Sequence, residues 1–321
     1  RIQPGLYWKP EGFLRLVKVG FDAQVDWTSF GTDVDPILEI DPRIQDAERK
    51  PKLSLNQAYI TTIMEGASIS LGLMRSSFGM GLVSNAGDDP NPGQVRANPF
   101  AIGRQGDRNF RFQLAVFPLG VRIIGKKPVP RLAIQAGVDA VFKDDRADWA
   151  EGDRAYQAVA GLMATRRIGP VEAQARLGTV YREQSHADGG DTAIWIAVAN
   201  ASASIGDEPS KQAWIEGEIA VTSGTSTYSQ SVLQPEDLEI FSLGGALRVG
   251  GQYKALEAVL EGGLATGDDQ SFDRESHTFS FDSEYQVGML MFSEALRVST
   301  ASTASHIADP VLRGQAPRGY E

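Results

Sequence analysis

The chain has 321 residues, 42% of them hydrophobic and 22% charged, a balance typical of folded rather than disordered proteins. Its formal net charge of −10 argues against a nucleic-acid partner, which would require a basic face. The absence of cysteine excludes thiolate catalysis, zinc–cysteine sites and disulfide bonds. The sequence has no apolar run long enough for a transmembrane helix, so any span of a membrane would have to be made by strands.

Segments with period-two hydrophobicity follow one another along the chain and predict about eleven β-strands. In the segment 171–182, for example, Val171 and Ala173 alternate with Glu172 and Gln174. Boundaries read from such patterns are uncertain by about 2–4 residues. The predicted strands are 13–27, 53–64, 67–74, 110–116, 132–142, 156–168, 171–182, 192–205, 212–222, 243–253 and 256–266.

The connections between these strands alternate between long and short along the whole series. Residues 143–153 form a long charged connection, 166–170 a short Gly-Pro turn and 182–191 a long connection again. Long loops on one side and short turns on the other are typical of outer-membrane β-barrels. If the long loops face the exterior, Arg1 lies on the periplasmic side.

A soluble antiparallel sheet with a solvated charged face is the alternative interpretation. Strand length argues against it. Strands of soluble proteins average about 5–6 residues, whereas the predicted strands approach the tilted membrane strands of about 9–11 residues. We therefore predict an all-β fold, an antiparallel up-and-down transmembrane β-barrel.

The two faces of the predicted strands differ in polarity. Aromatic residues near the strand ends of the apolar face suggest interfacial girdles. Charged residues on the other face would each cost about 2–4 kcal/mol in hydrocarbon, so we expect that face to line a lumen. The girdle candidates are Trp27, Phe110, Phe142, Tyr156, Tyr181 and Trp195. The predicted lumen-facing residues are Lys18, Asp22, Asp26, Arg111, Asp139, Glu172, Arg176, Arg182, Glu216, Glu218, Arg248, Glu257 and Glu261.

Three stretches resemble large proteobacterial outer-membrane porin-like barrels, including a deltaproteobacterial group and, more distantly, the alginate-export type. They are 70–90 (SLGLMRSSFGMGLVSNAGDDP), 106–117 (GDRNFRFQLAVF) and 265–296 (ATGDDQSFDRESHTFSFDSEYQVGMLMFSEAL). The resemblance implies a barrel of about 16–18 strands with a water-filled or partly plugged lumen. An alginate exporter would need an arginine-rich pathway, whereas the predicted inner face carries more acids than bases.

Two segments are candidates for a loop that narrows the lumen. Residues 75–109 carry Arg75, Arg104 and Arg108, and their Gly-Met-Gly run is also compatible with a compact surface loop. Residues 283–296, with Phe292, form an apolar run without clean alternation. A twelfth strand or a segment packed on the rim is the alternative for this run.

We expect no enzymatic activity. The histidines His186, His277 and His306 all lie in predicted loops, and no lipase-type serine motif is present. No cofactor is expected, except that acidic loops are weak candidates for calcium, although none has the spacing of a defined calcium loop. The candidate calcium ligands are Asp268, Asp269 and Asp273.

We treat residues 1–321 as one barrel domain, incomplete at its C-terminal end, because an odd strand count followed by a Pro- and Gly-rich segment does not close a barrel. The expected function is an outer-membrane porin-like channel for small hydrophilic solutes. The alternatives are a structural barrel that anchors an envelope assembly and a polysaccharide exporter. The expected partners are outer-membrane lipid and lipopolysaccharide, the solutes themselves and envelope proteins.

Overall fold

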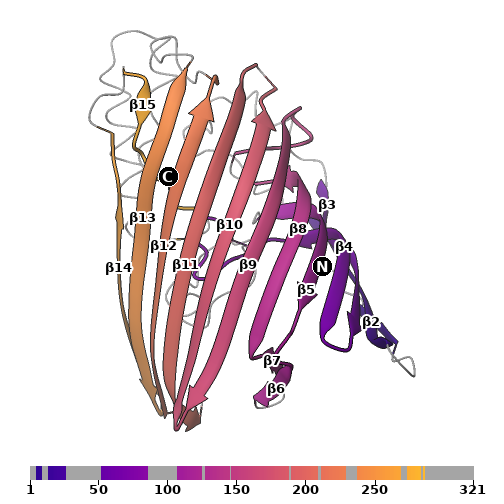
Figure 1. Ribbon diagram of the computed structural model, residues 1–321, viewed down its shortest axis with the longest axis vertical. Helices are drawn as coiled ribbons and strands as arrows, with labels where there is room; N and C mark the ends of the chain where they lie inside the picture. Colours follow the sequence, from indigo (N-terminus) through magenta and orange to yellow (C-terminus); the bar gives the residue numbers. More distant parts are fainter. Residues whose placement is uncertain are drawn as a thin grey trace.

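The computed structural model describes residues 5–8, 14–26, 52–85, 107–124, 127–144, 146–187, 189–208, 211–228, 237–268, 273–282 and 285. They form one large antiparallel sheet in which β1 to β5 and then β8 to β14 follow one another in chain order (Figure 1). A short parallel strand, β15, adds to β13, which makes the sheet 13-stranded. The predicted all-β, up-and-down arrangement is therefore confirmed.

The strands of the main sheet are long, and most exceed ten residues. β6 (Val121–Ile124) and β7 (Lys127–Pro130) form a separate hairpin between β5 and β8. The other strands are β1 (Gly5–Trp8), β2 (Leu14–Asp26), β3 (Lys52–Met64), β4 (Ala67–Arg75), β5 (Arg108–Val116), β8 (Leu132–Lys143), β9 (Arg154–Ile168), β10 (Val171–Ser185), β11 (Asp191–Glu208), β12 (Lys211–Ser226), β13 (Leu238–Tyr253), β14 (Leu256–Ala265) and β15 (Glu275–Ser276).

Two-residue turns close several of the hairpins at one end of the sheet. Gly66 and Gly169 adopt positive φ in the turns between β3 and β4 and between β9 and β10. Only glycine enters this backbone region without a steric cost, which explains its place in these turns. Lys254 has a φ of 57° in the turn between β13 and β14, and its ammonium lies over the Tyr253 ring, 5.4 Å from the ring centroid.

β1 was not predicted from the sequence. It pairs with β2 from Gly5 opposite Gly20 to Trp8 opposite Val17. β1 precedes β2 and runs in the opposite direction. Arg1 itself lies outside the described residues, so its periplasmic placement stays a prediction. The other predicted strands correspond to β2 to β5 and β8 to β14, although several extend further than expected, such as β11 over 18 residues.

The sheet is curved but open. β1 and β14 form its two edges, and no pairing joins them within the described ranges. Closure into a barrel and a total of 16–18 strands therefore remain predictions. Within the same ranges, no helix is long and apolar enough to cross a membrane.

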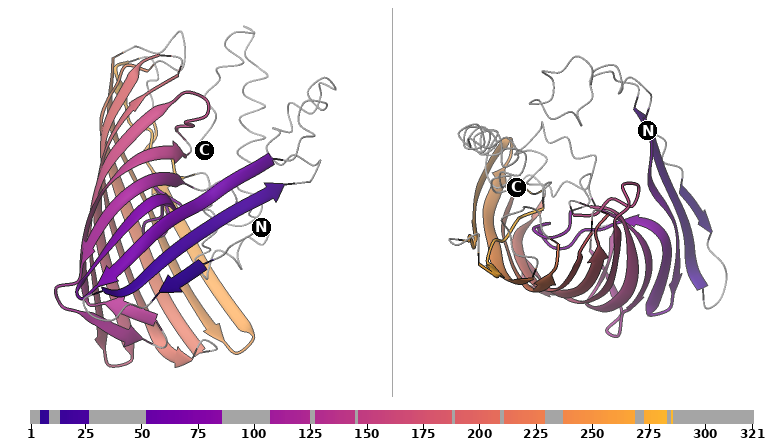
Figure 2. Two further views of the ribbon diagram at one scale, coloured as in Figure 1. Left: turned by 90° about the vertical axis from the view of Figure 1, so that its right-hand side faces the viewer. Right: turned by 90° about the horizontal axis from the view of Figure 1, so that it is seen from above.

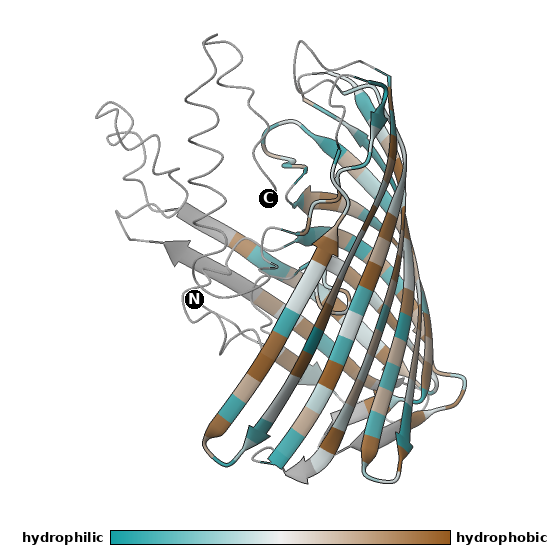
Figure 3. Cartoon of the chain, turned by 90° about the vertical axis from the view of Figure 1, so that its left-hand side faces the viewer, coloured by the Kyte–Doolittle hydropathy of each residue, from teal (hydrophilic) through white to brown (hydrophobic). Residues whose placement is uncertain are grey.

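The curvature gives the sheet a convex and a concave face (Figure 2). Exposure alternates along the strands: in β9, Tyr156 and Leu162 are exposed, whereas the residues that follow them, Gln157 and Met163, are half-buried. Hydropathy alternates in the same way along many strands (Figure 3). The predicted girdle residues Phe110, Phe142, Tyr156 and Trp195 are all exposed on the apolar convex face, and Tyr181 packs against Trp195 with ring centroids 4.8 Å apart. Trp27 lies outside the described residues.

Candidate functional site: a plug on the concave face

The charged residues predicted to line a lumen share the concave face of the sheet. Asp139, Arg182, Glu218 and Arg248 are buried there, and Arg248 has an exposed fraction of only 2%. The side chains of Asp22 and Asp26 lie outside the part of the structure that is described. The remaining members of the set are partly buried and occupy the same alternating positions: Lys18, Arg111, Glu172, Arg176, Glu216, Glu257 and Glu261.

Two segments that follow β4 and β15 fold onto this face and meet each other. They are residues 76–85 and 277–282 with Tyr285, and we call them the inner plug. The backbone N–H of Asn85 donates to the Asp282 carboxylate at 3.0 Å, and the N–H of Asp282 donates to the Leu82 carbonyl oxygen at 2.8 Å. Two segments far apart in the sequence are thereby hydrogen-bonded to each other on the concave face.

The plug has a small apolar core of its own. Met80, Leu82 and Tyr285 are almost fully buried together with Ala246 of β13. Phe279 packs on Val198 and Ala220, which belong to β11 and β12. Burial of large side chains in this way stabilises the folded position by about 1.5–3 kcal/mol for each side chain.

Missing side chains on the sheet provide the room for this core. A Cβ on Gly178 of β10 would come within 2.7 Å of the Phe78 ring, and a Cβ on Gly244 of β13 within 2.2 Å of the Phe279 ring. Both distances are shorter than a van der Waals contact allows. The two glycines therefore act as sockets for the plug aromatics.

A carboxyl group on the concave face of the sheet holds the plug through hydrogen bonds to its backbone. Glu218 of β12 accepts the backbone N–H of Met80 in a short hydrogen bond and that of Leu82 at 3.3 Å. The Tyr285 hydroxyl donates to Glu261 of β14 at 2.6 Å. Because these donors are buried, loss of their acceptors would leave polar groups unsatisfied, which costs more than the net worth of the bonds.

Next to Glu218, Glu216 forms an ion pair with Arg248 at 3.0 Å and accepts the Asn200 amide at 3.2 Å. The Nε and Nη1 atoms of Arg248 have no hydrogen-bond partner in the described ranges, nor has the Nε of Arg176. Buried guanidinium atoms without partners are uncommon and mark this layer as polar but incompletely satisfied.

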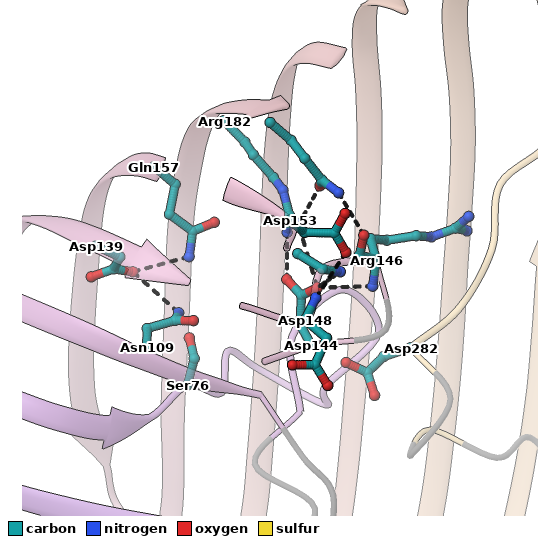
Figure 4. Close-up of polar contacts among 12 residues, drawn as sticks. Ser76, Asn109, Asp139, Asp144, Arg146, Asp148, Asp153, Gln157, Arg182 and Asp282 are labelled. Carbon is teal, nitrogen blue, oxygen red and sulfur yellow. Dashed lines mark hydrogen bonds and ion pairs between the residues drawn. The ribbon is translucent and has the colours of Figure 1, made fainter. Parts of the chain in front are cut away.

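A second polar network joins β5, β8 and β9 (Figure 4). Asp139 accepts two hydrogen bonds of 2.7 Å from Arg111, one of 3.3 Å from Asn109 and one of 3.0 Å from Gln157. Arg111 also donates to Ser76, the first residue of the plug, at 3.0 Å. A bidentate pair of this kind holds the guanidinium in a fixed direction.

The acidic connection between β8 and β9 is a folded turn. Asp144 accepts the N–H groups of Arg146 and Ala147 and pairs with Arg182 of β10 (Figure 4). Asp148 lies 3.2 Å from Lys143. Partial burial works to raise the pKa of Asp148, but the N–H of Ala150 and the Lys143 ammonium outweigh it, so that pKa lies below its usual range.

His186 belongs to a chain of hydrogen bonds at the end of β10. The side-chain amide of Gln184 accepts a hydrogen bond from Arg182 at 2.6 Å and donates one to the Arg146 carbonyl oxygen at 2.6 Å, and these two bonds fix its orientation. The amide nitrogen of Gln184 therefore donates to Nδ1 of His186 at 3.2 Å. Nε2 then carries the proton and donates to Thr192 at 2.9 Å. A histidine in this tautomer does not remove a proton from Thr192, so the geometry does not favour nucleophilic catalysis there.

His277 lies where the second plug segment begins. Its Nδ1 donates to the Phe241 carbonyl oxygen at 2.9 Å, and the Glu275 carboxylate lies 3.3 Å from Nε2. Both partners favour the protonated ring and raise the pKa of His277, the carbonyl oxygen having the larger effect.

The predicted constriction residues fall in different places. Arg75 ends β4, and Arg108 reaches the Leu55 carbonyl oxygen and the Asn56 side chain, each at 3.4 Å, on β3. Arg104 and Phe292 lie outside the described residues. The segment after Arg75 nevertheless folds inward, through residues that the sequence did not single out, among them Phe78 and Leu82.

The predicted calcium site lies only partly within the described ranges and stays a prediction. Asp273 accepts the N–H of Glu275 at 3.0 Å within its own turn, and Asp269 lies outside the description. No group of three or more metal-binding side chains occurs among the described residues, Asp268 included.

Comparison with protein-family models, with curated proteins and with solved structures found no match. The resemblance to porin-like barrels therefore stays a prediction from the sequence.

Proposed function

We propose that this chain forms the wall, or part of the wall, of a transmembrane β-barrel that passes small hydrophilic solutes across a Gram-negative outer membrane. The observation that carries the proposal is the division of the sheet into an apolar convex face and a charged concave face. Exposed apolar side chains such as Phe112, Val138, Leu177 and Leu247 lie on strand after strand. An apolar surface this extensive is unusual for a soluble protein.

The height of the apolar band suits a bilayer. On β10 the convex face runs from Val171 to Tyr181 without a charged residue. Ten residue steps of about 3.3 Å, at a strand tilt of about 35–45°, span about 25 Å, the usual height of the apolar band of outer-membrane barrels. Beyond the band, the Tyr181 hydroxyl donates to Glu183 at 2.7 Å, an arrangement that suits a membrane–water interface.

The inner plug bears on how the channel conducts. It lies against the charged face at mid-height and joins β4 to the region beyond β15, so a solute that follows this face has to pass it. We therefore expect a narrow pore of low conductance, with only mild cation preference because acids and bases both line the concave face.

A second candidate function is favoured by the same plug. If the plug occludes the lumen, the barrel anchors an envelope assembly and carries no flux. Export of a polysaccharide is the remaining alternative, and it predicts flux that one polymer blocks.

Single-channel recording in planar bilayers separates these functions. A steady small conductance with mild cation preference supports the solute channel, whereas insertion without conductance supports the structural barrel. A strong anion preference would contradict the assignment of the charged face to the lumen. Heat-dependent migration on gels, measured in parallel, establishes whether the protein inserted at all.

A further inference from the structure

A pocket of about 180 Å³ opens on the concave face between the plug and the short turns. Eight residues line it: Ala203, Ile215 and six residues that form two rows at the concave positions of their strands. Glu172, Ser204 and Trp214 form the row nearer to the short turns. Gln174, Ser202 and Glu216 form the row nearer to the plug.

The pattern of large and small residues creates the pocket. β11 contributes only small residues, two serines and Ala203, whereas β10 and β12 on either side of it contribute longer side chains. Neighbouring strands lie about 4.8 Å apart, so the backbones that carry Glu172 and Trp214 lie roughly 9–10 Å apart, with the serines of β11 between them. The volume of about 180 Å³ admits a group the size of a substituted ammonium or a single sugar ring.

One wall is an aromatic ring whose position is set by a glycine. The Trp214 indole lies against Gly250 of β13, where a Cβ would come within 2.3 Å of the ring. The ring therefore occupies space that a side chain would normally fill. Tryptophan is the aromatic side chain that attracts cations best through its π-face.

The opposite wall is a carboxylate, Glu172, which has no hydrogen-bond or ion-pair partner among the described residues. The second carboxylate of the pocket, Glu216, is held by Arg248 and Asn200. No lysine or arginine is part of the lining. An unpaired carboxylate and a tryptophan ring in the same pocket both attract a cation, and the carboxylate repels an anion.

We propose that this pocket binds a small organic cation, with its ammonium group between Glu172 and Trp214 and its polar groups on Ser202 and Ser204. The assignment rests on the proposed function in so far as the concave face is the solute path. In that setting the pocket is the place where a solute from the short-turn end is held before it meets the plug, since Glu216 lies two residues from Glu218. Organic cations are then the preferred solute class of the channel.

The test is a binding titration on the purified full chain in non-ionic detergent micelles, followed by tryptophan fluorescence. The ligands are choline, its uncharged carbon isostere 3,3-dimethylbutan-1-ol and glucose, with potassium chloride at matched ionic strength as the blank. We expect a saturable change with choline at a Kd on the order of 1–10 mM, and at least roughly tenfold weaker binding of the neutral isostere.

Two substitutions locate the signal. Trp214→Phe removes the saturable change, whereas Trp195→Phe, on the convex face, leaves it intact. Glu172→Gln, which preserves the shape of the side chain, weakens choline binding roughly tenfold. Far-ultraviolet circular dichroism establishes that each variant keeps the β-sheet, so a loss of binding in Glu172→Gln does not come from unfolding.

Several results would overturn the proposal: no saturable change with choline, equal binding of the neutral isostere, or unchanged binding in Glu172→Gln. Saturable binding of glucose without choline would make the pocket a saccharide site instead. Because the titration requires neither a bilayer nor flux, its failure leaves the conductance experiment standing, and a silent bilayer leaves the binding result standing.

Discussion

Replacement of Glu218 by alanine should release the inner plug. In the folded protein this carboxyl group is 4% exposed and accepts the N–H groups of Met80 and Leu82, the second at a long 3.3 Å. A buried donor without an acceptor costs about 1–3 kcal/mol, and the longer bond counts for less. Removal of a buried carboxyl group also relieves its desolvation, which offsets part of the loss. We expect a net shift of about 2–3 kcal/mol toward the open plug.

The absence of native cysteine provides a direct assay for that shift. A single cysteine at Met80, which is 1% exposed, reacts with a water-soluble thiol reagent only when the plug opens. A shift of about 2–3 kcal/mol raises the labelling rate roughly 30- to 150-fold, since each 1.4 kcal/mol is a factor of about ten. Glu239→Ala, an exposed acid of β13, is the matched control and should leave the rate within about twofold of its parent. An unchanged rate in Glu218→Ala, or equal rises in both variants, would refute the role of this carboxyl group.

Two further substitutions test the sockets and the faces. Gly244→Ala places a Cβ against the Phe279 ring and should lower the free energy of unfolding in urea by about 1–3 kcal/mol. The control is Gly262→Ala on β14, where a Cβ would meet nothing within 4 Å, and it should be neutral or slightly stabilising. Equal effects of the two substitutions would contradict the role of Gly244 as a socket. Leu177→Arg on the convex face should cost about 2–4 kcal/mol of stability in vesicles and lower the yield of the heat-modifiable species, whereas Thr222→Arg on the concave face should be tolerated better. If Thr222→Arg were the more destabilising of the two, the assignment of the convex face to lipid would be contradicted.

The strands and their faces were predictable because period-two alternation is a local property of the sequence. β10 illustrates this, since its charged and apolar residues alternate over most of its length. β1 was missed for the same reason: Leu6, Tyr7 and Trp8 are consecutive apolar residues, and a run without alternation gives no strand signal.

The inner plug could not be predicted because it depends on contacts between distant parts of the chain. Phe78 and Phe279 lie in aperiodic segments, and nothing local indicates that Gly178 and Gly244 leave room for them. The Gly-Met-Gly run at 79–81 was the one visible signal, since it indicates a compact segment. The pocket at Trp214 likewise depends on strand register, which brings Ser202 and Ser204 between two rows of longer side chains.

The central claim is that the convex face meets lipid and the concave face meets water. Single cysteines placed one at a time along β10 at residues 172–179, in protein folded into phospholipid vesicles, test it most directly with spin labels. The collision rates of the labels with a lipid-soluble and with a water-soluble relaxation agent should alternate with period two. Labels at Ala173, Ala175 and Leu177 should contact lipid, and labels at Glu172 and Gln174 should contact water. Equal access of the water-soluble relaxation agent to both faces would contradict the claim and indicate a soluble sheet.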